Sequence, residues 1–214
     1  MKARRILVLS PHPEDGELGC GGSVVRYLEA GCEVYYVAFT IAEKSTHPPF
    51  DPDAQKYEML NAVDILGIKK ANVIINNWEV RTYPENRQEI LEYMITLRED
   101  IKPHIVFCHS RDDSHQDHQT ITSEAIRAFK RSSILGYELP WNNFSFHCDY
   151  FREMSKKHID KKARALESYK SRSYRPYLAR DKIFSWMIMR GMQIEADYAE
   201  CFEVIRLVER LEIE

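Results

Sequence analysis

The stretch RILVLSPHPED, Arg5–Asp15, opens on an apolar run and ends on one imidazole and two carboxylates. The run from Ile6 to Leu9 predicts a buried strand, and His12, Glu14 and Asp15 follow it within a few residues. In open α/β folds, ligands bind beyond the carboxyl ends of the parallel strands. The stretch therefore predicts the first strand of an α/β fold with a functional site at its end.

Strand-like and helix-like segments alternate from this stretch onward. The expected strands cover residues 5–10, 33–40, 72–75 and 104–108, and the expected helices cover residues 22–30, 53–66, 85–100 and 118–130. Gly31 and Gly67 stand where two of these helices should end. The alternation predicts a Rossmann-like, mostly parallel sheet with helices on both faces.

Beyond residue 131 the pattern is less regular. We expect strands at residues 134–139, 144–151 and 201–206, the last with alternate residues buried, and helices at residues 155–169 and 181–190. These segments predict a small C-terminal α+β appendage on the main sheet. With 214 residues, the chain has the length of one domain, and we expect residues 1–214 to form it.

Composition excludes several classes of protein. The 30 basic and 33 acidic residues give a net charge of -3, so no nucleic acid is expected as a partner. The basic residues between Lys156 and Arg175 are interpreted as a solvated helix face. The five cysteines form no C-x-x-C pair, which argues against a disulfide framework and a thiolate zinc site. Neither a membrane span nor a signal peptide is apparent, so we expect a cytoplasmic protein.

A second polar cluster, His115-Gln116-Asp117-His118, follows the strand-like run at residues 105–108. Each cluster by itself is more often a capped turn than a metal site, but the occurrence of both at strand ends favours one shared metal. A hydrolytic zinc site needs about three ligands, an open position for water and a base. We assign the ligands to His12, Asp15 and His118, the base to Glu14, and proton donation to a protonated His115 oriented by Asp117.

At these residues the chain resembles the LmbE-like, or PIG-L-like, zinc-dependent de-N-acetylases, whose P-H-P-D-D-E and H-x-D-H motifs match His12–Asp15 and His115–His118 in order and spacing. The resemblance implies a Rossmann-like fold, zinc on His12, Asp15 and His118, and removal of acetyl groups from amino sugars of the N-acetylglucosamine type. The chain departs from the family pattern at four places, which are Glu14 for the usual aspartate, Gly16 for an acidic residue, Gln55 for an arginine, and residues 169–172 for H-x-S-Q.

The leading hypothesis is therefore a metal-dependent hydrolase that deacetylates a small N-acetylated sugar, with zinc or another divalent metal. Trp78, Tyr83 and Trp141 are candidates for a sugar-stacking rim, and Tyr198 is a candidate oxyanion donor or a core tyrosine. One alternative is a metal-containing sugar-binding protein whose catalysis has decayed. A nucleotide-binding oxidoreductase has little support, because the glycines at residues 19–22 fit neither nucleotide motif. The oligomeric state stays open, with a homo-oligomer among the options.

Overall fold

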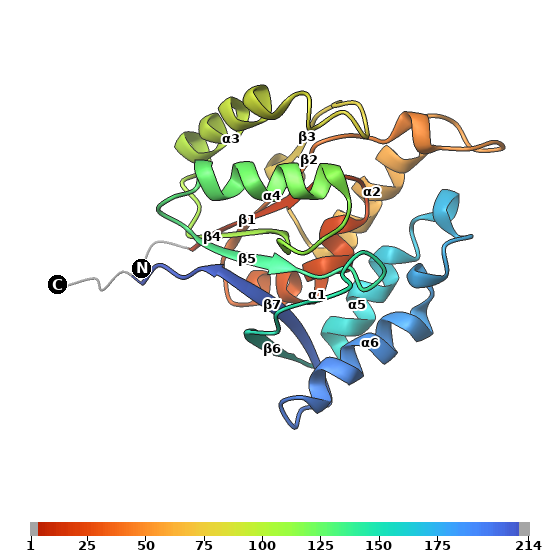
Figure 1. Cartoon of the computed structure of the whole chain (residues 1–214). Helices are drawn as coiled ribbons and strands as arrows, with labels where there is room; N and C mark the ends of the chain where they lie inside the picture. The colour runs from red at the N-terminus through yellow and green to blue at the C-terminus, as the bar shows by residue number, and fades with distance from the viewer. Residues whose placement is uncertain (1–3, 210–214) are drawn as a thin grey trace.

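The computed structural model describes residues 4–209 as a single sheet with helices on both faces (Figure 1). The order of the strands across the sheet is β3-β2-β1-β4-β5-β7-β6. Their bounds are β1 Arg5–Ser10, β2 Glu33–Ala38, β3 Val73–Ile75, β4 Ile105–His109, β5 Ser133–Tyr137, β6 Tyr150–Met154 and β7 Tyr198–Arg206. The pairs among β1 to β5 are parallel, whereas β7 runs antiparallel to β5 and to β6. The predicted α/β class and mostly parallel sheet are confirmed.

Six helices in the described part of the chain cover this sheet, with bounds α1 Asp15–Glu29, α2 Ala54–Leu66, α3 Arg87–Ile101, α4 Gln116–Ala128, α5 Lys156–Leu166 and α6 Arg180–Met192. Helices α3 and α4 pack together on one face, and α1, α2, α5 and α6 lie on the other (Figure 1). Each face has its own apolar core, so the sheet is buried on both sides. Burial on both faces explains why β7 has five consecutive buried residues rather than the expected alternation.

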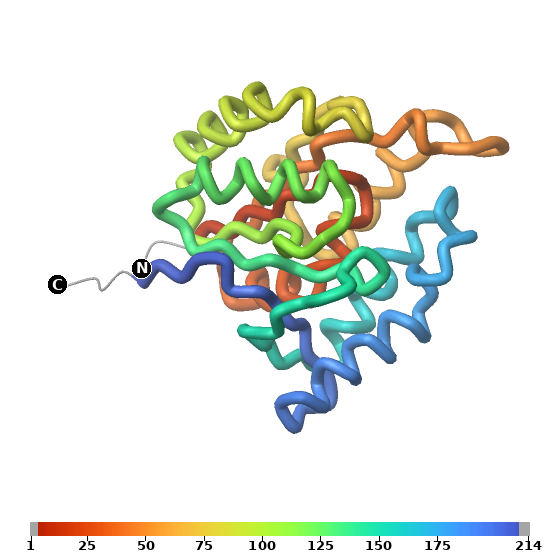
Figure 2. The backbone as a smooth tube through the Cα atoms, in the orientation of Figure 1, coloured from red at the N-terminus to blue at the C-terminus, as the bar shows by residue number. Residues whose placement is uncertain are grey.

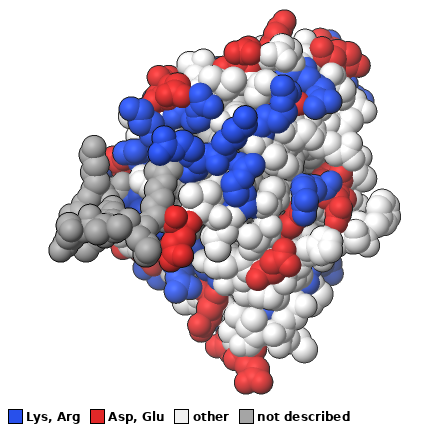
Figure 3. Space-filling view, turned by 60° about the vertical axis from the view of Figure 1, so that its left-hand side comes forward, with Lys and Arg blue, Asp and Glu red and all other residues white. Residues whose placement is uncertain are grey.

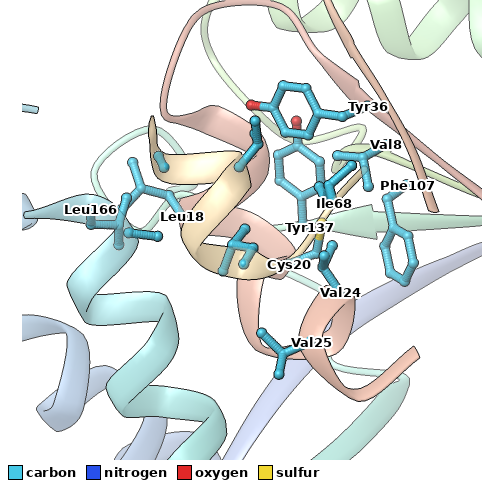
Figure 4. Packing of buried hydrophobic residues seen from close by; sticks show 14 of the residues in the cluster. Val8, Leu18, Cys20, Val24, Val25, Tyr36, Ile68, Phe107, Tyr137 and Leu166 are labelled. Atoms are coloured by element: carbon cyan, nitrogen blue, oxygen red, sulfur yellow. The ribbon is translucent and has the colours of Figure 1, made fainter. Parts of the chain in front are cut away.

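The glycines near the start of α1 let this helix lie close against the sheet. A Cβ atom built on Gly16 would lie 2.7 Å from a ring carbon of Tyr36, and one on Gly19 would lie 2.1 Å from a ring carbon of Tyr137. Figure 4 shows these two tyrosine rings beside α1, together with Val8 of β1. The close packing at Gly16 explains why a glycine replaces the acidic residue of the family pattern. The adjacent Glu17 is buried, and its carboxylate accepts hydrogen bonds from the hydroxyl groups of Tyr36 and Tyr169.

Helix α1 begins at Asp15, seven residues before the expected start at Gly22. The helix is kinked at Cys20, where the backbone dihedrals leave the helical region (φ -142°, ψ 18°). The kink frees the amide groups of the next turn, and the carboxylate of Glu200 accepts hydrogen bonds from Gly22 N at 2.8 Å and Ser23 N at 2.7 Å. The expected helix is thus only the second half of α1, capped by a side chain from β7.

Glu200 also forms a buried ion pair with Lys162 of α5, whose Nζ lies 2.8 Å from Oε1. Both side chains are almost completely inaccessible, so removing one partner leaves an uncompensated buried charge. We expect Glu200→Ala to lower the free energy of unfolding by about 3–5 kcal/mol in chemical denaturation. The exposed Glu33→Ala serves as the control and should change it by less than about 0.5 kcal/mol. A loss below about 1 kcal/mol for Glu200→Ala would show that the cap and the ion pair contribute little.

Two further expectations for the C-terminal part need correction. The strand expected at residues 144–151 lies instead at β6, because Phe144 is 94% exposed and only residues from Tyr150 onward pair with β7. The basic residues between Lys156 and Arg175 do not all lie on a solvated face, since Lys162 and Arg172 are buried and each pairs with a carboxylate. The α+β part itself is present and extends the main sheet through β7 and β6. Within residues 4–209, every helix is too short or too polar to cross a membrane.

Candidate active site

A cavity of about 410 Å³ opens beyond the carboxyl ends of β1 and β4, where the sequence places both polar clusters. Its floor is formed by His12, Glu14, Asp15 and His118. The walls come from three loops and from the segment between α5 and α6, namely residues 44–47, 80–81, 139–142 and 172–177. Figure 2 shows the orange loop after β2 and the blue segment before α6 projecting at the same end of the molecule. The cavity therefore lies where the α/β topology predicts a ligand site.

The three predicted metal ligands converge on one point. Nδ1 of His12 lies 3.0 Å from Nε2 of His118, and Oδ2 of Asp15 lies 3.3 Å from each of these nitrogens. Three ligands placed 2.0–2.1 Å from a tetrahedral zinc ion would stand about 3.3–3.4 Å apart. All three side chains are buried, with Asp15 at the first turn of α1 and His118 in the first turn of α4. The separations fit a tetrahedral divalent cation.

The outer nitrogens of the two histidines face carboxylates, and this determines which ring nitrogens carry protons. Nε2 of His12 is hydrogen-bonded to Oδ2 of Asp117 at 2.9 Å, and Nδ1 of His118 lies 3.0 Å from Oδ2 of Asp113. In the neutral form of His12 the proton resides on Nε2, facing Asp117, so Nδ1 presents its lone pair toward Nε2 of His118 and Oδ2 of Asp15. Oδ2 of Asp15 also accepts a hydrogen bond from His12 N at 2.9 Å, which fixes this carboxylate oxygen beside the two ring nitrogens.

Asp15 is held in the ionised form that a metal ligand needs. The pKa of Asp15 lies well below its usual range, because the attraction of His118 and His109 outweighs the effect of burial. Burial lowers the pKa of His12, but its hydrogen bonds to Asp117 and Asp15 raise the pKa above its usual value. A metal ion would compete with the proton on His12 for the same nitrogen lone pair.

Glu14 lies between two ligands and is held in an unusual conformation. Its backbone is left-handed (φ 73°), and its amide donates a hydrogen bond to the hydroxyl of Tyr169 at 2.9 Å. Arg172 pairs with Oε1 at 2.8 Å, whereas the buried Oε2 has no hydrogen-bond partner among residues 4–209. Burial raises the pKa of Glu14 to about 8, although Arg172 acts in the opposite direction. Glu14 thus presents one uncommitted carboxylate oxygen in the wall of the cavity.

Arg172 belongs to the 3-10 turn η3, Lys170–Arg172, and was not expected at the site. The turn is anchored to α2 by Glu58, whose carboxylate accepts hydrogen bonds from Ser171 N at 2.8 Å and Ser171 Oγ at 2.6 Å. The position that departs from the family pattern at residues 169–172 therefore supplies the partner of Glu14. Gln55, a second departure from the family pattern, lies on α2. Its side chain is fully buried and donates a hydrogen bond to Thr46.

His115 lies at the same centre but differs from its expected state. Its nitrogen approaches those of His12 and His118 within 4.8 Å, and its Nδ1 accepts a hydrogen bond from Asp117 N at 3.1 Å. Burial, together with the two neighbouring histidines, lowers the pKa of His115 to about 4, so the ring is neutral at neutral pH rather than protonated. With Nδ1 as an acceptor, the proton resides on Nε2, which is then a hydrogen-bond donor.

The carboxylate of Asp117, expected beside the His115 ring, lies instead on His12. Its Oδ2 accepts a hydrogen bond from Arg81 N at 2.7 Å as well as from His12. These hydrogen bonds, with the pull of His12, keep the pKa of Asp117 below its usual value despite burial. Asp117 thus orients a predicted metal ligand, and its backbone amide orients His115.

His109, the last residue of β4, was missed by the sequence reasoning. It is fully buried, with Nε2 at 3.3 Å from Oδ2 of Asp15 and Nδ1 at 3.2 Å from Oδ2 of Asp113. Burial lowers the pKa of His109, but the two carboxylates raise it by more than burial lowers it. The pKa of His109 therefore lies above its usual value. The only available signal was its place at a strand end, since it belongs to neither polar cluster.

The candidate rim residues separate into three groups. Trp141 lines the cavity and stacks on Tyr177, with ring centroids 3.8 Å apart. Tyr83 is fully buried and donates a hydrogen bond to Pro11 O, whereas Trp78 borders other hollows. Tyr198 packs edge-on against Phe184 beside the apolar core and is not among the residues that line the cavity, which favours the core alternative over the oxyanion-donor alternative.

The fold and the site together define an α/β protein with a histidine–carboxylate centre suited to a divalent cation. The family model described as "PIG-L: GlcNAc-PI de-N-acetylase" matches residues 7–129, which is more than half of the chain, and the chain belongs to this family. A similar curated protein is the "Uncharacterized deacetylase YaiS" of Escherichia coli (strain K12), 30% identical over 175 residues that cover 79% of this chain and 92% of that protein.

Solved structures share the fold at lower sequence identity. The conserved protein TT1542 from Thermus thermophilus superimposes with a TM-score of 0.80 at 23% identity, covering 98% of both chains. The N,N'-diacetylchitobiose deacetylase from Pyrococcus horikoshii superimposes with a TM-score of 0.76 at 21% identity, covering 95% of this chain and 84% of that one. These similarities confirm the fold across nearly the whole chain.

Proposed function

We propose that this protein is a metal-dependent N-deacetylase that releases acetate from an amino sugar of the N-acetylglucosamine type. The observation that carries the proposal is the convergence of His12, Asp15 and His118 on one point, with the free Oε2 of Glu14 in the same cavity wall. The family description, the deacetylase from Escherichia coli and the diacetylchitobiose deacetylase all support removal of acetyl groups.

The chain's own residues can be given roles from their positions. When bound, a divalent cation would supply Lewis-acid activation of the acetyl carbonyl and of a water molecule. Oε2 of Glu14 would accept a proton from the attacking water, while Arg172 holds Oε1. Nε2–H of His115 would donate a hydrogen bond to the carbonyl oxygen as negative charge develops on it.

Breakdown then separates the two products. The bond between the carbonyl carbon and the sugar nitrogen breaks, and the proton taken up by Glu14 passes to the leaving amine, so the products are acetate and the free amino sugar. Stacking of the sugar ring on Trp141, backed by Tyr177, would place the acetamido group toward the floor of the cavity.

Acetate release tests the proposal directly. Protein loaded with zinc, with its metal content measured by elemental analysis, should release acetate from one or more members of a panel of N-acetylated sugars and sugar conjugates. Treatment with a chelator should stop release, and added zinc should restore it. Saturable sugar binding without acetate release from any member of the panel would contradict the proposal and favour the sugar-binding alternative.

A further inference from the structure

The cavity is positive in a chain whose net charge is negative. Lys44, Arg81, Arg172 and Arg175 line it, whereas the only carboxylates among its lining residues are Glu14 and Asp15 on the floor. The net charge of the chain is -3, so the excess of cations is local to this cavity. Basic side chains also form a band on the face shown in Figure 3, but those in the cavity surround the proposed metal centre. A cavity lined by one sign of charge concentrates ligands of the opposite sign.

Two of these cations have no carboxylate partner. Arg172 is paired with Glu14, and Lys44 is paired with Glu79 in an exposed ion pair of the kind that contributes little. Among residues 4–209, no ion pair involves Arg81 or Arg175, although the Arg175 guanidinium lies 5.0 Å from the ring centre of Tyr174. Arginines without partners at the wall of a ligand cavity fit an anionic group that the ligand itself brings.

The backbone of Arg81 is tied to the metal centre. Its amide donates to Asp117, the residue that orients His12, and its carbonyl accepts a hydrogen bond from Gln116 Nε2 at 2.6 Å. Arg81 also has a left-handed backbone (φ 70°), which is uncommon outside glycine, asparagine and aspartate. The loop therefore fixes the backbone of Arg81 beside the predicted metal ligands, and the residue lines the same cavity.

Arg175 approaches from the opposite chain segment. It links η3 to the second 3-10 turn, η4 (Pro176–Leu178), and its amide donates to Arg172 O at 2.8 Å. Tyr177 of η4 stacks on Trp141, the aromatic platform proposed for the sugar ring. Arg175 and Arg81 thus line the cavity from two segments, next to the platform and next to the metal centre.

We propose that the substrate is an anionic conjugate, in which a phosphate or carboxylate group attached to the N-acetylated sugar binds Arg81 and Arg175. The inference rests on the proposed function, since the metal centre and the platform place the sugar. Phosphate and carboxylate share the planar, two-oxygen recognition that a guanidinium provides. Both arginines are exposed, and a neutral sugar would leave their guanidinium groups without a charged partner.

Three probes that differ only at the anomeric substituent test this inference. They are N-acetyl-α-D-glucosamine 1-phosphate, the carboxymethyl glycoside of the same sugar and the neutral methyl glycoside. With zinc-loaded protein, we expect kcat/KM to be at least about tenfold higher for an anionic probe than for the methyl glycoside, because each charged contact adds binding that the neutral probe lacks. The comparison of the two anionic probes distinguishes phosphate from carboxylate. Added salt should lower the preference.

Variants identify the residues responsible. Arg81→Gln and Arg175→Gln should each reduce the ratio of anionic to neutral kcat/KM by about tenfold. The matched control Arg164→Gln, at an exposed position of α5 outside the cavity, should leave the ratio unchanged. Equal kcat/KM for the three probes, or a ratio unaffected by both cavity variants, would overturn the inference while leaving the proposed function intact.

Binding measurements separate the two proposals. Dissociation constants of the same three probes, measured by calorimetry, do not depend on turnover. Tighter binding of an anionic probe without acetate release would support the charge preference and contradict the proposed function. Equal dissociation constants without acetate release would contradict both.

Discussion

Glu14→Gln is expected to retain the metal and to lose turnover by a factor of about 10²–10⁴, the usual contribution of a general base. Glutamine keeps the shape of the side chain and can still accept a hydrogen bond from Arg172, but its amide cannot take a proton from water. The metal should stay because the predicted ligands are His12, Asp15 and His118, whose converging atoms do not include Glu14. Steady-state acetate release and elemental analysis of the same samples give both readouts.

Two companion variants test how Glu14 is positioned. Arg172→Gln removes the contact to Oε1, and Glu14→Asp shortens the side chain by one methylene so that it no longer spans the distance to Arg172. A displacement of about 1 Å costs on the order of a hundredfold in rate, and we expect a loss of this size in kcat for each variant with metal content unchanged. The aspartate is informative because it restores the usual residue of the family in a chain that pairs this position with an arginine.

The outcomes that contradict the assignment are distinct. Full activity of Glu14→Gln would mean that another group accepts the proton. Loss of metal from the same variant would mean that Glu14 is a ligand. Full activity of Glu14→Asp with Arg172 intact would show that the arginine does not position the carboxylate.

The positions of the strand ends could be predicted because they depend on the local pattern of apolar residues. Short apolar runs separated by helix-like segments indicate parallel strands, and parallel strands bring their carboxyl ends to one edge. Residues just beyond β1 and β4 were therefore expected at the same edge of the sheet, and the structure, in which these two strands are adjacent, places His12 and His118 with facing nitrogens 3.0 Å apart. The meeting of the two polar clusters could therefore be predicted without any knowledge of side-chain geometry.

The partners of the centre could not be predicted because they depend on tertiary contacts. Arg172 reaches Glu14 across 158 positions of sequence, and Glu200 reaches α1 from β7 at the other end of the chain. His109 lies just beyond the strand expected at residues 104–108 and in neither polar cluster, and only the tertiary fold sets it beside Asp15. The glycines at residues 19–22 predicted close packing of a helix on a strand, which Gly19 shows against the ring of Tyr137, whereas the kink at Cys20 between them could not be predicted.

Loss of the metal should follow His12→Ala and His118→Ala but not His109→Asn, although the structure offers two overlapping sets of ligands. One set contains His12, His115 and His118, and the other contains Asp15, His109 and His118. The rings of His109 and His118 are stacked, with centroids 3.6 Å apart and planes inclined by 11°, so their lone pairs lie in separate, nearly parallel planes, which is unfavourable for binding one ion. The rings of His12 and His118 are inclined by 49°.

Access to substrate favours the same set. A catalytic metal needs an open coordination position, and His12 and His118 line the cavity, whereas the fully buried His109 does not. His109 instead sits between the carboxylates of Asp15 and Asp113 and supports a ligand from behind. Residues in this position typically affect metal affinity by about 10–100-fold, while loss of a direct ligand should exceed that range.

Competition with a chromophoric chelator measures these affinities. His12→Ala and His118→Ala should bind zinc more than about a hundredfold more weakly than the parent protein and release no acetate, because three ligands are the minimum for such a site. His109→Asn should weaken binding by about 10–100-fold and still take up close to one equivalent at saturating zinc. His147→Ala, an exposed histidine outside the cavity, is the control and should match the parent. If His109→Asn lost the metal and His12→Ala kept it, the ion would belong between Asp15, His109 and His118, and the base would have to be sought on that side of the sheet edge.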